Sequence, residues 1–193
     1  MDTKKAVLIA KDVLKSLRTN RYVPNCGVFA RISTRSEDSI NNRPNELQDI
    51  IDNLNNGSRK CEVCALGACF LSHVALYDDF KCDRLLSTIP YERNTCTLRE
   101  DIRYFEPDIT TLINRLYTIF GLDLPLIENA FECGDGFYGV GTKMNVIAAM
   151  SYKHLGTSRE RLIAIMKNII RNKGRFIPPR KAYRQYAKEH PKC

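Results

Sequence analysis

Apolar residues recur at every third or fourth position through most of this chain, a spacing that is typical of amphipathic α-helices. In the N-terminal segment this spacing joins Val7, Ala10, Val13 and Leu17. The predicted helices cover residues 3–19, 45–55, 108–120, 145–155 and 159–171, with a shorter helix beginning at Pro125. The pattern therefore predicts a mainly α fold, in which a single domain contains a bundle of several helices.

The segment from Lys60 to Tyr77 is predicted to be the central helix of this bundle. Beyond its first turn it is apolar on nearly every face, which is typical of a helix enclosed by other helices. Gly67 costs this helix about 1 kcal/mol of propensity relative to Ala, so we expect a close contact with a neighbouring helix to offset that cost.

Two local signals add to the helical pattern. Pro24 and Gly27 interrupt it after the first helix, and the segment Gly27–Ser33 alternates well enough to predict a short strand. Thr157 and Glu160 have the spacing of a capping box, in which each side chain accepts a hydrogen bond from a free amide at a helix start. The first signal predicts at most a small β element attached to the helices, and the second supports the helix predicted at residues 159–171.

The charge of the chain is unevenly distributed. The whole chain of 193 residues has a net charge of +8, yet residues 153–193 alone hold twelve Lys or Arg and two Glu, a local charge of +10. The other 152 residues therefore carry a net −2. Such asymmetry points to an acidic partner, and a solvated tail that aids solubility is the alternative. We accordingly divide the chain into a helical domain, residues 1–175, and a basic C-terminal segment, residues 176–193.

The candidate partner-binding residues combine cations, which could neutralise phosphates, with aromatic rings, which could stack on unpaired bases. They are Arg171, Lys173, Arg175, Arg180, Lys181, Tyr183, Arg184, Tyr186 and Lys188, together with Phe137 and Tyr138 of a glycine-rich loop. No helix-turn-helix, zinc-finger or RNA-recognition signature accompanies them, so an acidic protein surface and a nucleic acid both stay open as partners.

The glycine-rich loop, residues 133–142, holds four of the ten glycines of the chain. Its glycines Gly134, Gly136 and Gly139 match the spacing of a dinucleotide-binding fingerprint. That fingerprint follows a strand, whereas a helical pattern precedes this loop. We therefore interpret the loop as a second contact with the partner and predict no cofactor.

Cysteines suggest an alternative function. Cys61, Cys64, Cys69 and His73 are four soft ligands within thirteen residues, a number that suits tetrahedral zinc. A thiol at Cys61 or Cys64 in the first turn of a helix would also be activated by the helix dipole and by nearby cations. The chain is therefore either a non-enzymatic binding protein or, as the alternative, a thiol- or zinc-dependent enzyme centred on Cys61 and Cys64.

The expected location is cytoplasmic. No window approaches the eighteen apolar residues of a membrane span, and Lys11 and Asp12 interrupt the N-terminal apolar run before a signal-peptide core could form. We therefore expect no membrane contact and mostly reduced thiols among the eight cysteines.

Three stretches resemble small proteins of bacteria and their phages for which no activity is known. They are the Cys64–Ala68 segment behind an amphipathic first helix, Leu126–Glu132, and Arg161–Ile170. The resemblance covers about a third of the chain and implies a small cytosolic, phage-encoded protein. In that setting we expect an inhibitor-like protein that occupies a partner of the host.

Overall fold

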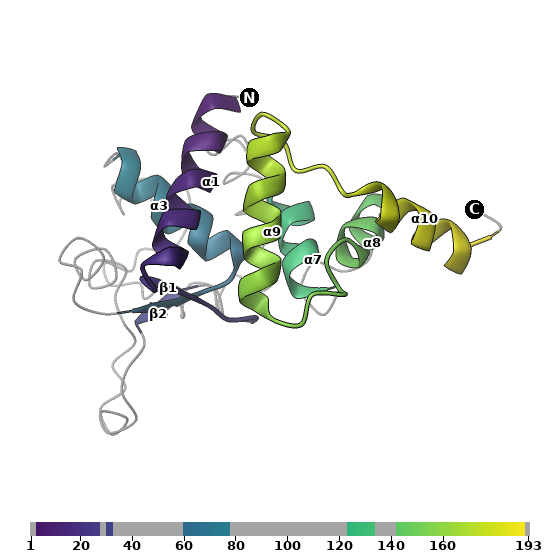
Figure 1. Ribbon diagram of the computed structural model, residues 1–193, viewed down its shortest axis with the longest axis horizontal. Coiled ribbons are helices and arrows are strands. Elements are labelled where there is room, and N and C mark those ends of the chain that lie inside the picture. The colour runs from purple at the N-terminus through teal and green to yellow at the C-terminus, as the bar shows by residue number, and fades with distance from the viewer. Residues whose placement is uncertain (1–2, 28–29, 33–59, 78–122, 134–141, 192–193) are drawn as a thin grey trace, which may run out of the picture.

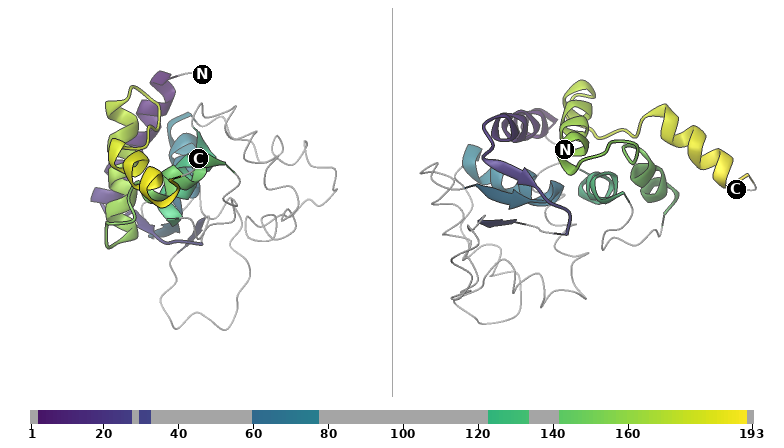
Figure 2. Two further views of the ribbon diagram at one scale, coloured as in Figure 1. Left: turned by 90° about the vertical axis from the view of Figure 1, so that its right-hand side faces the viewer. Right: turned by 60° about the horizontal axis from the view of Figure 1, so that its bottom comes forward.

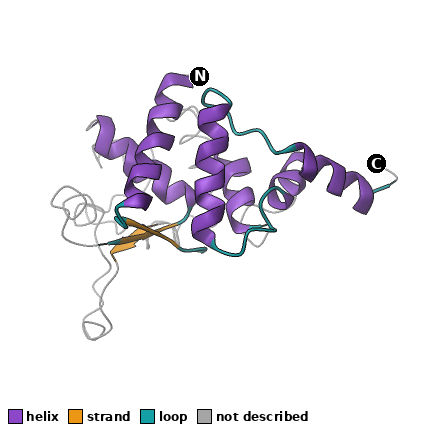
Figure 3. Cartoon of the chain, in the orientation of Figure 1, coloured by secondary structure: helices purple, strands orange, loops and turns teal. Residues whose placement is uncertain are grey.

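The computed structural model describes residues 3–27, 30–32, 60–77, 123–133 and 142–191. Its helices are α1 (Thr3–Arg18), α3 (Ala65–Tyr77), α7 (Leu124–Glu132), α8 (Lys143–Met150), α9 (Ser158–Arg171) and α10 (Arg180–Glu189) (Figures 1 and 3). Its strands are β1 (Tyr22–Pro24), β2 (Ala30–Ile32) and β3 (Cys61–Val63). The predicted mainly α fold is confirmed for this part of the chain.

Helices α1 and α9 lie side by side and antiparallel; α1 packs against α3, and α9 packs against α7 (Figures 1 and 2). At one end the Arg159 guanidinium, in the first turn of α9, donates a hydrogen bond to the carbonyl of Leu17, near the end of α1. At the other end Gly174 follows α9 and lies against the backbone of Thr3, so closely that a Cβ at Gly174 would clash. Gly174 also has a φ of +91°, which favours glycine.

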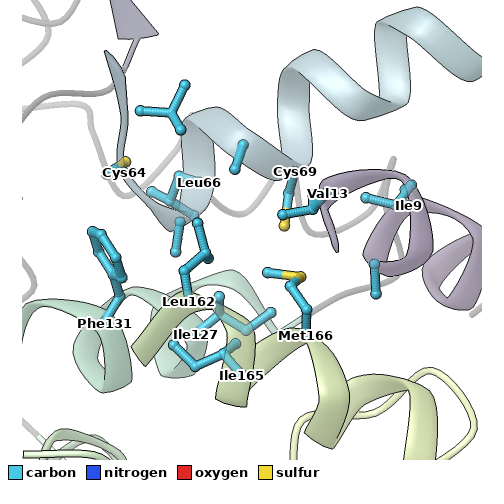
Figure 4. Close-up of a cluster of buried hydrophobic side chains, with 14 of the residues drawn as sticks. Ile9, Val13, Cys64, Leu66, Cys69, Ile127, Phe131, Leu162, Ile165 and Met166 are labelled. Atoms are coloured by element: carbon cyan, nitrogen blue, oxygen red, sulfur yellow. The ribbon is translucent and has the colours of Figure 1, made fainter. Parts of the chain in front are cut away.

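The hydrophobic core lies between these two helices and the pair α3 and α7 (Figure 4). Helix α1 contributes Ile9 and Val13, and α9 contributes Leu162, Ile165 and Met166. These side chains meet Leu66 and Cys69 of α3 and Ile127 and Phe131 of α7. Because α1 and α9 each turn their apolar face toward this cluster, their polar faces lie on the outside of the same layer.

A three-stranded sheet with the order β1-β3-β2 lies beside the start of α3. Strand β1 pairs in parallel with β3, with Tyr22 opposite Cys61, and β2 pairs antiparallel with β3, with Ala30 opposite Val63. The amide of Cys61 donates a hydrogen bond of 2.9 Å to the Arg21 carbonyl, at the end of the turn that follows α1.

The predicted central helix is wrong in its first turn. Residues Cys61–Val63 form the middle strand, and α3 begins only at Ala65. Cys61 and Val63 are buried while Glu62 is half-buried, an alternation with the period of a strand. Strand β1 was not predicted at all, because a three-residue strand that ends in Pro carries almost no local signal.

The remaining helix predictions have mixed outcomes. The capping box at Thr157 and Glu160 is confirmed, with both of its hydrogen bonds present. Helix α8 ends at Met150, short of the predicted residue 155. The helices predicted at residues 45–55 and 108–120 lie outside the described residues, as do Gly134–Gly141 of the glycine-rich loop. Among the helices that are described, none is both long and apolar enough to span a bilayer.

Candidate functional site

The C-terminal cations are presented by a helix whose opposite face is buried. In α9 the side chains of Leu162, Ile165, Met166 and Ile169 are buried, and Lys167 and Arg171 are exposed on the other face. Lys173 and Arg175, which follow the helix, are exposed as well. The hydrophobic core therefore fixes the direction in which these four cations face.

The connection between α9 and α10 is held by side-chain bonds to its backbone. The Asn168 amide donates to the Ile177 carbonyl at 2.7 Å, and its Oδ1 accepts from the Ile177 amide at 3.0 Å. The same Asn168 amide group also donates to the Tyr152 hydroxyl, and the Tyr152 ring packs against buried Phe176. The connection is therefore held by hydrogen bonds to the backbone of Ile177 and by packing of the Phe176 side chain.

Helix α10 has little buried surface and projects from the body of the molecule (Figure 1). Ala182 is its one buried residue, and the helix packs against α8. The cations of α10 are all exposed; they are Arg180, Lys181, Arg184 and Lys188. This projecting helix presents four cations to solvent, with Glu189 as its only acidic residue.

The two tyrosines of α10 hold this helix to its neighbour. The Tyr186 ring stacks on His190 with centroids 4.3 Å apart, and Lys143 Nζ of α8 lies 5.4 Å from its centre. The Tyr183 hydroxyl contacts Met144 Sδ at 3.9 Å, although this side chain is 39% exposed. The structure thus brings together nine of the predicted partner-binding residues along α9, the connection and α10. Phe137 and Tyr138 lie outside the described residues.

The thiols proposed as nucleophiles lie in the core. Cys61 is fully buried in β3, and Cys64 is 4% exposed in the turn before α3. Burial raises the pKa of Cys61 to about 11, and burial together with the nearby Glu128 raises the pKa of Cys64 well above its usual value. Cys61 lies in a strand, so the expected position in the first turn of a helix is wrong for it. Cys64 directly precedes α3 and its Sγ accepts a hydrogen bond of 3.5 Å from the Gly67 amide, which lowers its pKa, but the effect of burial is larger.

The four soft ligands do not form one group. Cys61 lies in the sheet, Cys64 in the turn, and Cys69 and His73 in α3. The part of the chain that the structure describes contains no group of three or more His, Cys, Asp or Glu side chains placed to hold a metal ion.

A pair of buried carboxylates, which the sequence analysis did not single out, lies where α7 meets the start of α3. Glu128 is 5% exposed and Glu132 is 8% exposed. Glu128 accepts a hydrogen bond of 3.1 Å from the Leu66 amide, and Glu132 accepts one of 3.0 Å from the Gly27 amide. The two carboxyl groups also share a hydrogen bond with each other, and the Cys64 thiol bonds to Glu128.

Burial, and then the charge of Glu132, raise the pKa of Glu128 to about 8. Glu128 is therefore protonated at neutral pH and donates its proton toward Glu132, while Glu132 keeps the amide of Gly27 as a second donor. The signal for this pair was present in the sequence, because Glu128 and Glu132 are one helical turn apart on the face that carries Ile127 and Phe131.

Arg161 is the cation that joins several elements of the core. Its Nε donates to the Phe131 carbonyl at 2.8 Å, near the end of α7, and its guanidinium lies over the Phe131 ring. The same group donates to Cys26 Sγ at 3.3 Å and to Ser158 Oγ at 3.2 Å. Arg161 therefore has a structural role and does not belong to the exposed basic residues.

Comparisons of the chain with protein-family models, with curated proteins and with solved structures found no match.

Proposed function

We propose that this protein is a binding protein that engages an acidic macromolecule through its basic C-terminal surface. That surface is defined by the exposed cations Lys167, Arg171, Lys173, Arg175, Arg180, Lys181, Arg184 and Lys188. The observation that carries the proposal is the position of α10, which holds four of these cations away from the body of the molecule while α8 anchors its base.

The anchored connection between α9 and α10 supports this proposal. A surface whose cations are already placed loses less conformational entropy on binding than a tail that must be ordered first. Asn168 fixes Ile177, and Tyr186 fixes α10 against Lys143, so the two halves of the surface are held by separate contacts.

The state of the thiols favours binding over the thiol-dependent enzyme. A nucleophilic cysteine needs access to substrate and a lowered pKa, so that the thiolate is populated at neutral pH. Cys61 and Cys64 are buried, and the pKa of each is raised.

The test replaces the four cations of α10 with Gln, in the variant Arg180→Gln, Lys181→Gln, Arg184→Gln and Lys188→Gln. Fluorescence anisotropy would measure binding to labelled double-stranded and single-stranded nucleic acids and to polyglutamate. We expect the native chain to bind at least one of these polymers at physiological salt, and the variant to lose more than about tenfold in affinity because it lacks four positive charges.

The matched control keeps the charge and exchanges the side chains, Arg180→Lys, Lys181→Arg, Arg184→Lys and Lys188→Arg. It should bind within a few-fold of the native chain. The proposal is overturned if no acidic polymer binds, or if the Gln variant binds as tightly as the native chain.

A further inference from the structure

A second row of cations lies outside the C-terminal segment, on α1. Residues 3–21 hold six Lys or Arg and one Asp. The exposed positions of α1 are spaced by four and three residues along one side of the helix, and all but one of them are cations. They are Lys4, Leu8, Lys11, Lys15 and Arg18. The near-neutral charge of residues 1–152 as a whole conceals this local excess.

The tertiary structure places the start of the α1 row next to the cations of α9. Because α1 and α9 are antiparallel, the end of α9 that carries Lys167 and Arg171 lies beside the start of α1. The contact between Gly174 and Thr3 fixes this neighbourhood and places Lys173 and Arg175 at the same end. Because the buried faces of α1 and α9 contribute to the core shared with α3 and α7, the exposed cations of both helices lie on the outer side of this layer.

The acidic residues of α1 and α9 are Asp12 and Glu160, and neither lies at the end where the start of α1 meets the end of α9. Asp12 of α1 is only partly exposed, with one carboxylate oxygen fully buried. Glu160 lies at the far end of α9, where its carboxylate accepts hydrogen bonds from the amide and the hydroxyl of Thr157. Among the described residues of α1 and α9, cations therefore outnumber acids at the end formed by the start of α1 and the end of α9.

The chemistry of this face favours phosphate over an acidic protein surface. Protein interfaces have an apolar centre and are depleted in Lys, whereas the exposed side of α1 has three Lys, one Arg and a single apolar residue, Leu8. Lys4 and Arg18 are fourteen residues apart, about 21 Å along a helix, a length over which a duplex presents about twelve phosphates.

The arrangement of the aromatic rings favours a duplex over a single strand. Binding to unpaired bases uses several exposed aromatic faces as stacking platforms. On α10 the Tyr186 ring already stacks on His190 and faces Lys143, and Tyr183, which is 39% exposed, contacts Met144. The exposed positions of α1 and α9 include no aromatic residue.

We infer that the outer layer of α1 and α9 and the basic C-terminal surface form one continuous surface that binds the phosphate backbone of a duplex nucleic acid. This inference rests on the proposed function, since it names the partner of the same surface and extends that surface to α1. Contacts to the backbone alone do not select a sequence, so the affinity is independent of base sequence.

The experiment compares the native chain with the α1 variant Lys11→Gln, Lys15→Gln and Arg18→Gln. A labelled DNA duplex of about two helical turns is titrated by anisotropy between about 50 and 200 mM salt, and an RNA duplex and polyglutamate are titrated in parallel. The matched control, Lys11→Arg, Lys15→Arg and Arg18→Lys, keeps the charge. Circular dichroism verifies that each variant is folded.

We expect the slope of log affinity against log salt to become shallower by about three in the α1 variant, because each phosphate contact contributes about 0.9 to the slope. The affinity at 0.15 M salt should then fall on the order of a hundredfold. The control should keep the native slope. DNA and RNA duplexes share the phosphate chemistry, so binding to either supports the inference. Their relative affinities show which of the two duplexes is the preferred partner.

Three outcomes overturn the inference, and they differ in what they mean for the proposed function. If the α10 variant loses duplex binding while the α1 variant keeps it, the proposed function stands and α1 is not part of the surface. If polyglutamate binds and neither duplex does, the proposed function stands with a protein as partner. If none of these polymers and no single strand binds, both proposals fail.

Discussion

The carboxyl groups of α7 and the cations of α1, α9 and α10 are ionisable groups in opposite surroundings. Glu128 and Glu132 are buried and hydrogen-bonded to amides, to each other and to a thiol. The cations of the outer layer are exposed. The charge of the buried carboxyl groups therefore depends on pH, whereas the exposed cations can contact a partner. We therefore expect the stability of the fold to depend on pH through the buried carboxyl groups, and the affinity for a partner to depend on salt through the exposed cations.

The largest expected effect concerns Glu128. Its pKa is raised from 4.5 to about 8, so the folded chain keeps a proton that the unfolded chain loses above pH 4.5. This group therefore lowers the stability of the fold progressively between pH 4.5 and 8, by an amount on the order of a few kcal/mol, and has no further effect above pH 8.

The variant Glu128→Gln keeps an acceptor for the Leu66 amide but has no titratable proton. We expect its stability relative to the native chain to rise steadily between pH 4.5 and 8. Urea unfolding at several pH values measures this difference. A difference that is independent of pH would contradict the description of Glu128 as a buried neutral acid.

Arg161 is a cation with structural partners, unlike the exposed cations of the outer layer. In Arg161→Gln the Phe131 carbonyl, Cys26 and Ser158 lose a charged donor. Hydrogen bonds to charged groups contribute about 1.5–3 kcal/mol, so we expect a loss of stability of that order, measured by urea unfolding.

The matched control is Lys167→Gln, which removes an exposed cation from the same helix. Its stability should stay within about 0.5 kcal/mol of the native chain. If both variants lost the same stability, the hydrogen bonds of Arg161 would not distinguish it from the surface cation Lys167.

Glu160 is an exposed acid whose role is structural. The variant Thr157→Ala removes the side-chain acceptor of the capping box and should destabilise the fold by about 1 kcal/mol in thermal or urea unfolding. Glu160→Gln preserves the box with a neutral side chain and should cost less. If Glu160→Gln is the more harmful change, the charge at the start of α9 matters more than the hydrogen bonds.

The smallest expected effect concerns Glu189, the acidic residue of α10. Glu189→Gln removes one negative charge from the basic C-terminal surface. At about 10 Å from a partner charge in water, this change should raise affinity for the duplex about twofold, with unchanged stability. Anisotropy at low salt detects it, and a lowered affinity would contradict a binding surface on α10.

The helices were predictable where local signals agree. The apolar spacing and the Thr157–Glu160 capping box placed α9 correctly, and Pro125 lies in the first turn of α7 as expected. The strand Cys61–Val63 could not be predicted, because its letters fit an apolar helix and only pairing with β1 and β2 makes it extended. The same error put Cys61 in the first turn of a helix, whereas Cys64 does lie directly before the start of α3.

Local sequence is enough to predict α1, α7 and α9 and the basic last fifth of the chain, since these depend on residues within a few positions of each other. Only the folded chain shows that Glu128 is buried beside Glu132 and Cys64, and that the start of α1 lies beside the cations at the end of α9. Burial and the proximity of distant segments are long-range properties. Charge counted along the chain averages out an excess on α1 that packing against α9 makes part of one surface.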